Sequence, residues 1–173
     1  PALRNSYILY FLKGEKALNT FEITKLLKTE AEKLILEKIN IDKTHIYDGD
    51  FTNKSDIQDN ATVILYTVRL SKPYEGFINY TYEDSSIYNL VFEVAVTLQT
   101  KEKEMNLGDL LLFLSNDRLI TKRYANTQNK LEKNIKNVGQ LQNSNFIEND
   151  EKWFQQILTF NFIYEGEYSH GNI

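Results

Sequence analysis

The stretch IYNLVFEVAVTLQT at residues 87–100 decides the fold. Apolar side chains occupy every second position of this stretch, and they are Tyr88, Leu90, Phe92, Val94, Val96 and Leu98. Polar residues take most of the positions between them, and they include Asn89, Glu93, Thr97 and Gln99. Because successive side chains of a strand point to opposite faces of a sheet, this alternation predicts a long strand with one buried face.

Two further stretches have the pattern of long strands. Residues 61–71 are β-branched and aromatic and predict a central strand, and residues 153–165 again alternate between apolar and polar side chains. Shorter strands are expected at residues 45–47 and at residues 135–141. The first of these is followed by Asp48-Gly49, which is a two-residue turn signal. Residues 48–60 are expected to form a polar, acidic loop.

Two amphipathic helices accompany these strands. From Asn19 onward, apolar residues recur every three or four positions, and Glu22 lies three residues after Asn19 as in a capping box. Glu30 and Lys33 are spaced for an ion pair on this helix. Asn106 can cap a second helix with a leucine stripe, which we expect to break near residues 115–117.

Helices with an apolar stripe and strands with one apolar face must cover each other. The sequence therefore predicts a two-layer α+β fold, a mostly antiparallel β-sheet with two or three helices packed on it, in a single domain. We place this domain at residues 19–166, after an N-terminal arm at 1–18 and before a flexible tail at 167–173. The apolar run Tyr7–Leu12 in the arm fits either a buried strand or an arm that docks on a neighbour.

Composition limits the possible functions. The 173-residue chain has no cysteine and a formal charge of −4, which argues against disulfides, thiolate chemistry and non-specific nucleic-acid binding. No apolar stretch approaches the length of a membrane span, and the first residues lack the pattern of a secretory signal, so we expect neither membrane insertion nor export. Residues 118–136 are rich in lysine and arginine; we favour a solvated helix face there over a phosphate-binding surface.

Catalytic and cofactor motifs are not found. Histidine, the commonest general base, occurs only at positions 45 and 170, and no nucleophile-elbow or phosphate-loop motif is present. The nearest approach to a metal motif is Asp48, Asp50 and Asp56, for which a solvated acidic turn is the favoured interpretation. We therefore expect that the chain is not an enzyme and has no catalytic residue, no cofactor and no metal. The remaining alternative is a hydrolase that uses His45.

The surplus in this chain is aromatic. Residues 72–86 are too long for a tight turn and should form their own hairpin or flap with exposed aromatic side chains. Aromatic side chains dominate the energetics of protein interfaces. The residues expected at such an interface are Tyr7, Tyr10, Phe11, Tyr74, Phe77, Tyr80 and Tyr82. The flap aromatics fit equally well as cross-strand pairs folded over the sheet.

The order of these elements resembles the phage tail-terminator and neck-terminator proteins, a family of tail completion proteins. The order is helix, short strand ending Tyr47-Asp48-Gly49, long strand, aromatic flap, long strand ending Val96-Thr97-Leu98-Gln99, helix, and final long strand. The closing segment from Gly139-Gln140-Leu141 through Phe146-Ile147-Glu148-Asn149-Asp150 to Trp153–Phe160 also resembles that family, as a polar loop leading into an aromatic strand. The likeness covers about residues 21–165; the arm at 1–18 and the long 118–136 stretch depart from it.

This resemblance implies a structural virion protein without an active site. It implies a homo-oligomeric ring of six copies that caps the tail tube and contacts the tube protein, the neck or connector protein and, in a contractile tail, the sheath. Such a ring is assembled in the host bacterial cytoplasm, and the genome can pass through its lumen without specific binding. The alternatives are another head-tail joining protein, or a monomeric adaptor that binds a polypeptide by strand addition.

Overall fold

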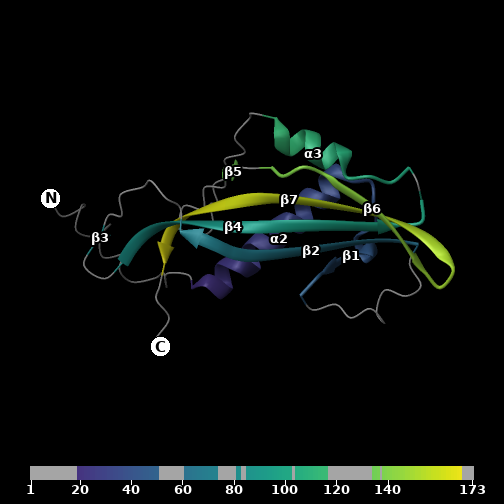
Figure 1. Cartoon of the computed structure of the whole chain (residues 1–173). Helices are drawn as coiled ribbons and strands as arrows, with labels where there is room; N and C mark the ends of the chain where they lie inside the picture. Colours follow the sequence, from purple (N-terminus) through teal and green to yellow (C-terminus); the bar gives the residue numbers. More distant parts are fainter. Residues whose placement is uncertain are drawn as a thin grey trace.

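The computed structural model describes residues 19–50, 61–73, 81–82, 85–102, 104–116, 134–136 and 138–168. The chain forms a single α+β arrangement, with a mostly antiparallel sheet and two α-helices among the described residues (Figure 1). The elements are α2 Thr20–Lys38, the 3₁₀ turn η1 Lys43–His45, β1 Ile46–Asp48, β2 Thr62–Pro73, β3 Thr81–Tyr82, β4 Ser85–Thr100, α3 Gly108–Ser115, β5 Asn134–Lys136, β6 Gln142–Glu148 and β7 Glu151–Tyr168. The predicted fold class is confirmed.

The sheet is built around the long strand quoted above. Its main path runs β1-β2-β4-β7-β5, while β3 pairs with β4 and β6 pairs with β7. All these pairs are antiparallel except β1 with β2. The β4–β7 ladder is continuous from Ser86 opposite Tyr168 to Thr100 opposite Phe154, so these two strands form the centre of the sheet.

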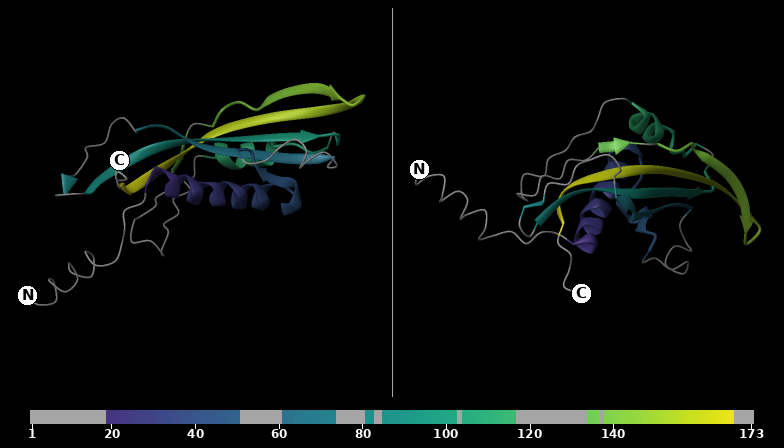
Figure 2. Two further views of the ribbon diagram at one scale, coloured as in Figure 1. Left: turned by 90° about the horizontal axis from the view of Figure 1, so that it is seen from below. Right: turned by 60° about the vertical axis from the view of Figure 1, so that its left-hand side comes forward.

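One face of the sheet carries both helices. The alternating apolar residues of the three long strands point to this face, and α2 runs along it (Figure 2, left). Leu107, Leu110 and Leu114 bring α3 into the same core. The largest fully buried side chains of the sheet are Tyr164, Phe92, Phe160, Phe162, Ile64 and Leu98. No described helix lies on the opposite face of the sheet.

The first helix begins where the sequence predicts. Asn19 Oδ1 accepts a hydrogen bond from Glu22 N at 2.9 Å, and Glu22 Oε2 accepts one from Asn19 N at 2.9 Å. This reciprocal capping box satisfies backbone donors that would otherwise lack partners at the helix start. The expected pair is also present, with Lys33 Nζ 3.6 Å from Glu30 Oε1.

The second helix begins one residue later than a cap at Asn106 would place it. The cap position is Leu107, which makes no side-chain cap hydrogen bond. Asn106 Oδ1 instead accepts from Gly108 N at 2.8 Å and closes a local turn ahead of the helix. The helix ends at Ser115, so the predicted break near residues 115–117 is confirmed.

The turn expected at Asp48-Gly49 follows β1, which runs parallel to β2, and Gly49 N donates a hydrogen bond to Tyr66 O at 2.8 Å. Two local predictions are wrong. The single strand expected at 135–141 is only β5, since residues 138–141 are not in a strand. The polar loop expected before residue 153 is strand β6, paired with β7 along its whole length.

The end of the last strand also differs from expectation. β7 continues to Tyr168, three residues beyond the strand end predicted at residue 165, because Tyr168 pairs with Ser86 at the start of β4. The flap region is described only in part: Thr81 and Tyr82 form β3 and pair with Ser86 and Ser85. The basic stretch is described only at residues 134–136, so its predicted helical character lies outside the described residues.

Candidate assembly surfaces

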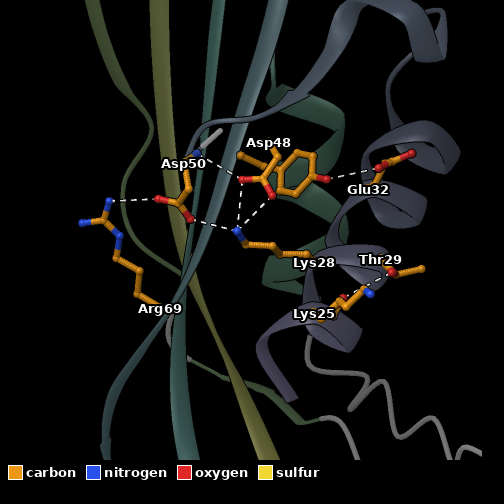
Figure 3. Close-up of polar contacts among 8 residues, drawn as sticks. Lys25, Lys28, Thr29, Glu32, Asp48, Asp50 and Arg69 are labelled. Atoms are coloured by element: carbon orange, nitrogen blue, oxygen red, sulfur yellow. Dashed lines mark hydrogen bonds and ion pairs between the residues drawn. The ribbon is translucent and has the colours of Figure 1, made fainter. Parts of the chain in front are cut away.

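A cluster of charged side chains joins α2 to the end of β1 (Figure 3). Lys28 Nζ lies 2.9 Å from Asp48 Oδ2 and 2.9 Å from Asp50 Oδ2. Arg69 on β2 adds a bond from its guanidinium to Asp50 Oδ1 at 3.2 Å. The Lys28 side chain is only 14% exposed, so its ammonium is held largely away from bulk water between two carboxylates.

The charges in this cluster shift the pKa values of its members. Burial alone would lower the pKa of Lys28, but hydrogen bonds to Asp50 and Asp48 and their negative charges outweigh it and raise that pKa. The hydrogen bond from Lys28 lowers the pKa of Asp50, against the opposing effect of burial and with help from Arg69. Burial and the neighbouring Glu32 charge raise the pKa of Tyr66, whose hydroxyl donates to Glu32 at 3.1 Å. Lys28, Asp50 and Tyr66 are therefore held in their ordinary charge states at neutral pH.

This arrangement differs from the solvated acidic turn that was expected at Asp48 and Asp50. Asp48 and Asp50 are 24% and 27% exposed and bound to a lysine, so they are not a solvated turn. Within the described part of the chain, no group of three or more acidic, histidine or cysteine side chains could hold a metal ion, and Asp56 lies outside that part. The cluster fixes the turn after β1 against α2.

His45 is similarly tied to the fold. Its Nδ1 lies 3.0 Å from the carbonyl oxygen of Thr62, at the start of β2. A hydrogen bond there requires the tautomer that carries the proton on Nδ1. This contact joins η1 to the sheet, which is a structural role for the histidine named above as a possible base.

The hairpin formed by β6 and β7 is the surface that the sequence did not predict. Asn149 and Asp150 connect the strands with φ of 51° and 61°, the left-handed pair of a type I′ turn. The hairpin extends beyond β4, since Thr100 at the end of β4 pairs with Phe154. Figure 1 shows its tip projecting past the other strands of the sheet.

Aromatic and charged side chains contact one another on this projecting hairpin. The rings of Phe146 and Trp153, which are cross-strand partners, stack with centroids 6.0 Å apart and an interplanar angle of 7°. Lys101 Nζ lies 4.9 Å from the Trp153 ring centre and forms an ion pair with Glu151. Ile147 on the same hairpin is 76% exposed, a large apolar side chain in water. The signal available in the sequence was Asn149-Asp150, with Phe146 and Trp153 at equal distances from it.

The two outer edges of the sheet differ in chemistry. Beyond the short β1, the β2 edge carries Arg69, a bulge between Leu70 and Lys72, and Pro73. Charged side chains, bulges and proline are the means by which proteins block pairing at a sheet edge. The β6 edge has none of them between Gln142 and Ile147, and no described strand pairs with its outer side. Among the residues that the structure describes, one edge is therefore protected and the other is open.

A pocket lies beside the open edge, on the side of the sheet that carries the helices. It has a volume of about 470 Å³. Leu98, Met105 and Phe154 provide apolar walls, and Asn106, Asn143 and Asn145 provide side-chain amides. Gln156 is fixed there, because its Oε1 accepts from Leu107 N at 2.7 Å and its Nε2 donates to Asn143 at 2.8 Å. The pocket is thus preformed, with polar groups around an apolar interior.

The interface residues expected from the sequence are not tested by this geometry. Tyr7, Tyr10, Phe11, Tyr74, Phe77 and Tyr80 lie outside the described residues. Tyr82 lies in β3, where its backbone pairs with Ser85. The structure therefore brings together a different set of candidate contact groups, at the β6–β7 hairpin.

Comparison with known proteins does not assign the chain to a family. No protein-family model and no curated protein matches it. Among the described residues, neither helix has the length and apolarity needed to cross a membrane.

Proposed function

We propose that this chain is a structural protein of a phage or phage-like particle, which caps the tail tube as a ring of identical copies. The resemblance noted above suggests six copies. The same ring joins the tube to the neck or connector protein and, where the tail contracts, to the end of the sheath. The protein acts by shape and contact and transforms no molecule.

The observation that carries this proposal is the difference between the two sheet edges. A closed ring needs heterologous contacts, in which one surface of each copy meets a different surface of the next. The open edge at β6 and the protected edge at β2 are two different surfaces on opposite sides of the sheet, and they give the protomer a direction. The projecting β6–β7 hairpin, on which Ile147 is exposed, adds contact area at its end of the sheet.

The direct experiment measures the mass of the assembly formed with and without purified tail tubes. We expect the free chain to associate weakly and to form a ring on the tube end, because contacts with the tube offset the entropic cost of ordering the contact segments. Stable rings at low concentration without tubes would contradict the need for a template. Failure to bind tubes of any kind would contradict the function itself.

A variant separates interface from core. Tyr80→Ala should leave the melting temperature nearly unchanged and reduce incorporation into particles, because we place Tyr80 among contact residues. Tyr164→Ala is the matched control, since Tyr164 is fully buried and its loss should lower the melting temperature. An equal loss of melting temperature in both variants would move Tyr80 into the core.

A monomeric adaptor is the second candidate, favoured by the same open β6 edge. Such a protein would add an extended segment of its partner to the sheet. Association with particles distinguishes the two functions, because an adaptor would bind its peptide as a single copy and would not be found at the tube end.

A further inference from the structure

The open edge of β6 presents a regular row of backbone groups. In a hairpin with a two-residue turn, Glu148 and Glu151 form a hydrogen-bonded pair, and the pattern then alternates along the strand. The N–H and C=O groups of Asn143, Asn145 and Ile147 therefore point outward, away from β7. An extended segment could add there without disturbing the existing ladder.

One segment of this chain has the composition to do so. Residues 7–12 read YILYFL, six consecutive residues with strong β preference and no charge, followed by Lys13-Gly14. Because side chains alternate along a strand, Tyr7 and Tyr10 would point to opposite faces. Whichever way the segment is aligned, one tyrosine points to the face that holds the pocket.

The pocket matches a tyrosine side chain. Its apolar walls suit the ring, and the amides of Asn143, Asn145 and Asn106 can bond to a phenolic hydroxyl. A volume of about 470 Å³ is large enough for one such ring. Exposed Ile147 on the hairpin gives further apolar contact for the residues of an added strand.

Asn19, at which the arm of the same copy joins α2, lies far along the sheet from this edge. Leu12 and Asn19 are separated by six residues, which span at most about 25 Å when extended. The 19-residue helix α2 alone is about 28 Å long. It begins near the end of the sheet at which β7 ends, and β6 lies at the opposite end (Figures 1 and 2). We therefore take the donor to be another copy.

We propose that residues Tyr7–Leu12 of one copy add as a strand to the outer edge of β6 in the next copy, with one tyrosine in the adjacent pocket. The proposal rests on the ring described above and names the contact that closes it. The contact is heterologous, because arm and edge are different surfaces, and it repeats from copy to copy around a ring.

The test uses the full chain carrying Tyr10→Pro, which disables its own arm, and a synthetic peptide of residues 5–14 as probe. Amide hydrogen exchange is measured at Asn143, Asn145 and Ile147. We expect these amides to exchange freely in the variant alone, and to be protected when the peptide is added. The same peptide with proline in place of Tyr10 should give no protection.

Two substitutions at one position locate the binding edge. Asn145→Pro removes an outward N–H, whereas Asn145→Ala removes the same side chain and keeps that N–H. Peptide binding should be lost in the first and retained in the second. Absence of protection by the peptide, or equal binding by both variants, would overturn the proposal. The wild-type chain is also measured in dilute solution, where it is monomeric. If these amides are protected there and the protection disappears in Tyr10→Pro, the arm docks within one copy, and the proposal is overturned as well.

The peptide-binding test and the test of the proposed function can fail independently of each other. If the peptide does not bind but the wild-type chain still caps tail tubes, the arm contact is wrong and the ring function stands. If the peptide binds but no tube is capped, the edge accepts a strand in a protein of another function.

Discussion

Replacing Lys28 by methionine tests how much the ion pairs of Lys28 with Asp48 and Asp50 contribute to the free energy of unfolding. Methionine keeps an unbranched apolar stem in the half-buried site and removes the ammonium that lies 2.9 Å from both Asp48 and Asp50. Hydrogen bonds to charged groups contribute about 1.5–3 kcal/mol each when buried, and partial exposure reduces this. We expect a net loss of about 2 kcal/mol in the free energy of unfolding, or roughly 4–8 °C in melting temperature for a chain of this size.

The control is Lys25→Met on the same helix. Lys25 is exposed, so its loss should change the free energy of unfolding by less than about 0.5 kcal/mol. Both variants are compared with wild type by thermal unfolding followed by circular dichroism, which reports the helix and the sheet together.

The difference between wild type and Lys28→Met should depend on pH in a defined way. The pKa of Asp50 is lowered in the folded chain, so its contribution is complete above its ordinary pKa and is lost as pH falls through the lowered one. The pKa of Lys28 is raised, so its contribution is complete below its ordinary pKa and is lost as pH rises through the raised one. The difference should therefore be constant near neutrality and shrink below about pH 4. A Lys28→Met effect no larger than that of Lys25→Met, or one that persists unchanged in acid, would refute this reasoning.

Three further substitutions test separate parts of the fold by thermal or denaturant unfolding. Asn19→Ala removes the capping box of α2 and should cost about 1 kcal/mol, whereas Asn40→Ala, at an exposed position after the helix, should cost almost nothing. Phe160→Asp should abolish folding, because a carboxylate at a site 1% exposed costs several kcal/mol, and a folded variant would show that this site is not core. Gly139→Ala should destabilise the chain, because the added Cβ would lie 2.6 Å from Thr159 Oγ1; Thr159→Ala should partly rescue it, and no rescue would place the strain elsewhere.

The parts of the fold that the sequence predicts are those fixed by local pattern. The alternation in residues 87–100 predicts β4 because every second side chain is drawn from water to one face. Asn19 and Glu22 predict the start of α2 because both partners of the capping box lie within one turn. In each case the interacting residues are close in the sequence.

The parts that were missed depend on distant partners. β6 has no apolar alternation, since Gln142, Asn143, Ser144 and Asn145 are all exposed, and only its pairing with β7 makes it a strand. Asp48-Gly49 has the chemistry of a hairpin turn, yet β1 pairs in parallel with β2.

The charged cluster at Lys28 and the pocket beside β6 could be predicted even less from the sequence. Lys28 and Asp48 are 20 residues apart, so their ion pair depends on how α2 lies against the sheet. The pocket beside β6 combines residues from β4, β6, β7 and the segment before α3, which no spacing rule connects. Phe146 and Trp153 could have been paired from the Asn149-Asp150 turn, had residues 142–148 been interpreted as a strand.

The measurement that bears most directly on the proposed function is electron microscopy of native particles in which this chain is located by a fused tag. We predict a single ring of copies at the end of the tail tube, in contact with the neck, and none along the tube or free of particles. Particles that lack the chain, or that carry it as isolated copies away from the tube end, would contradict the proposed function.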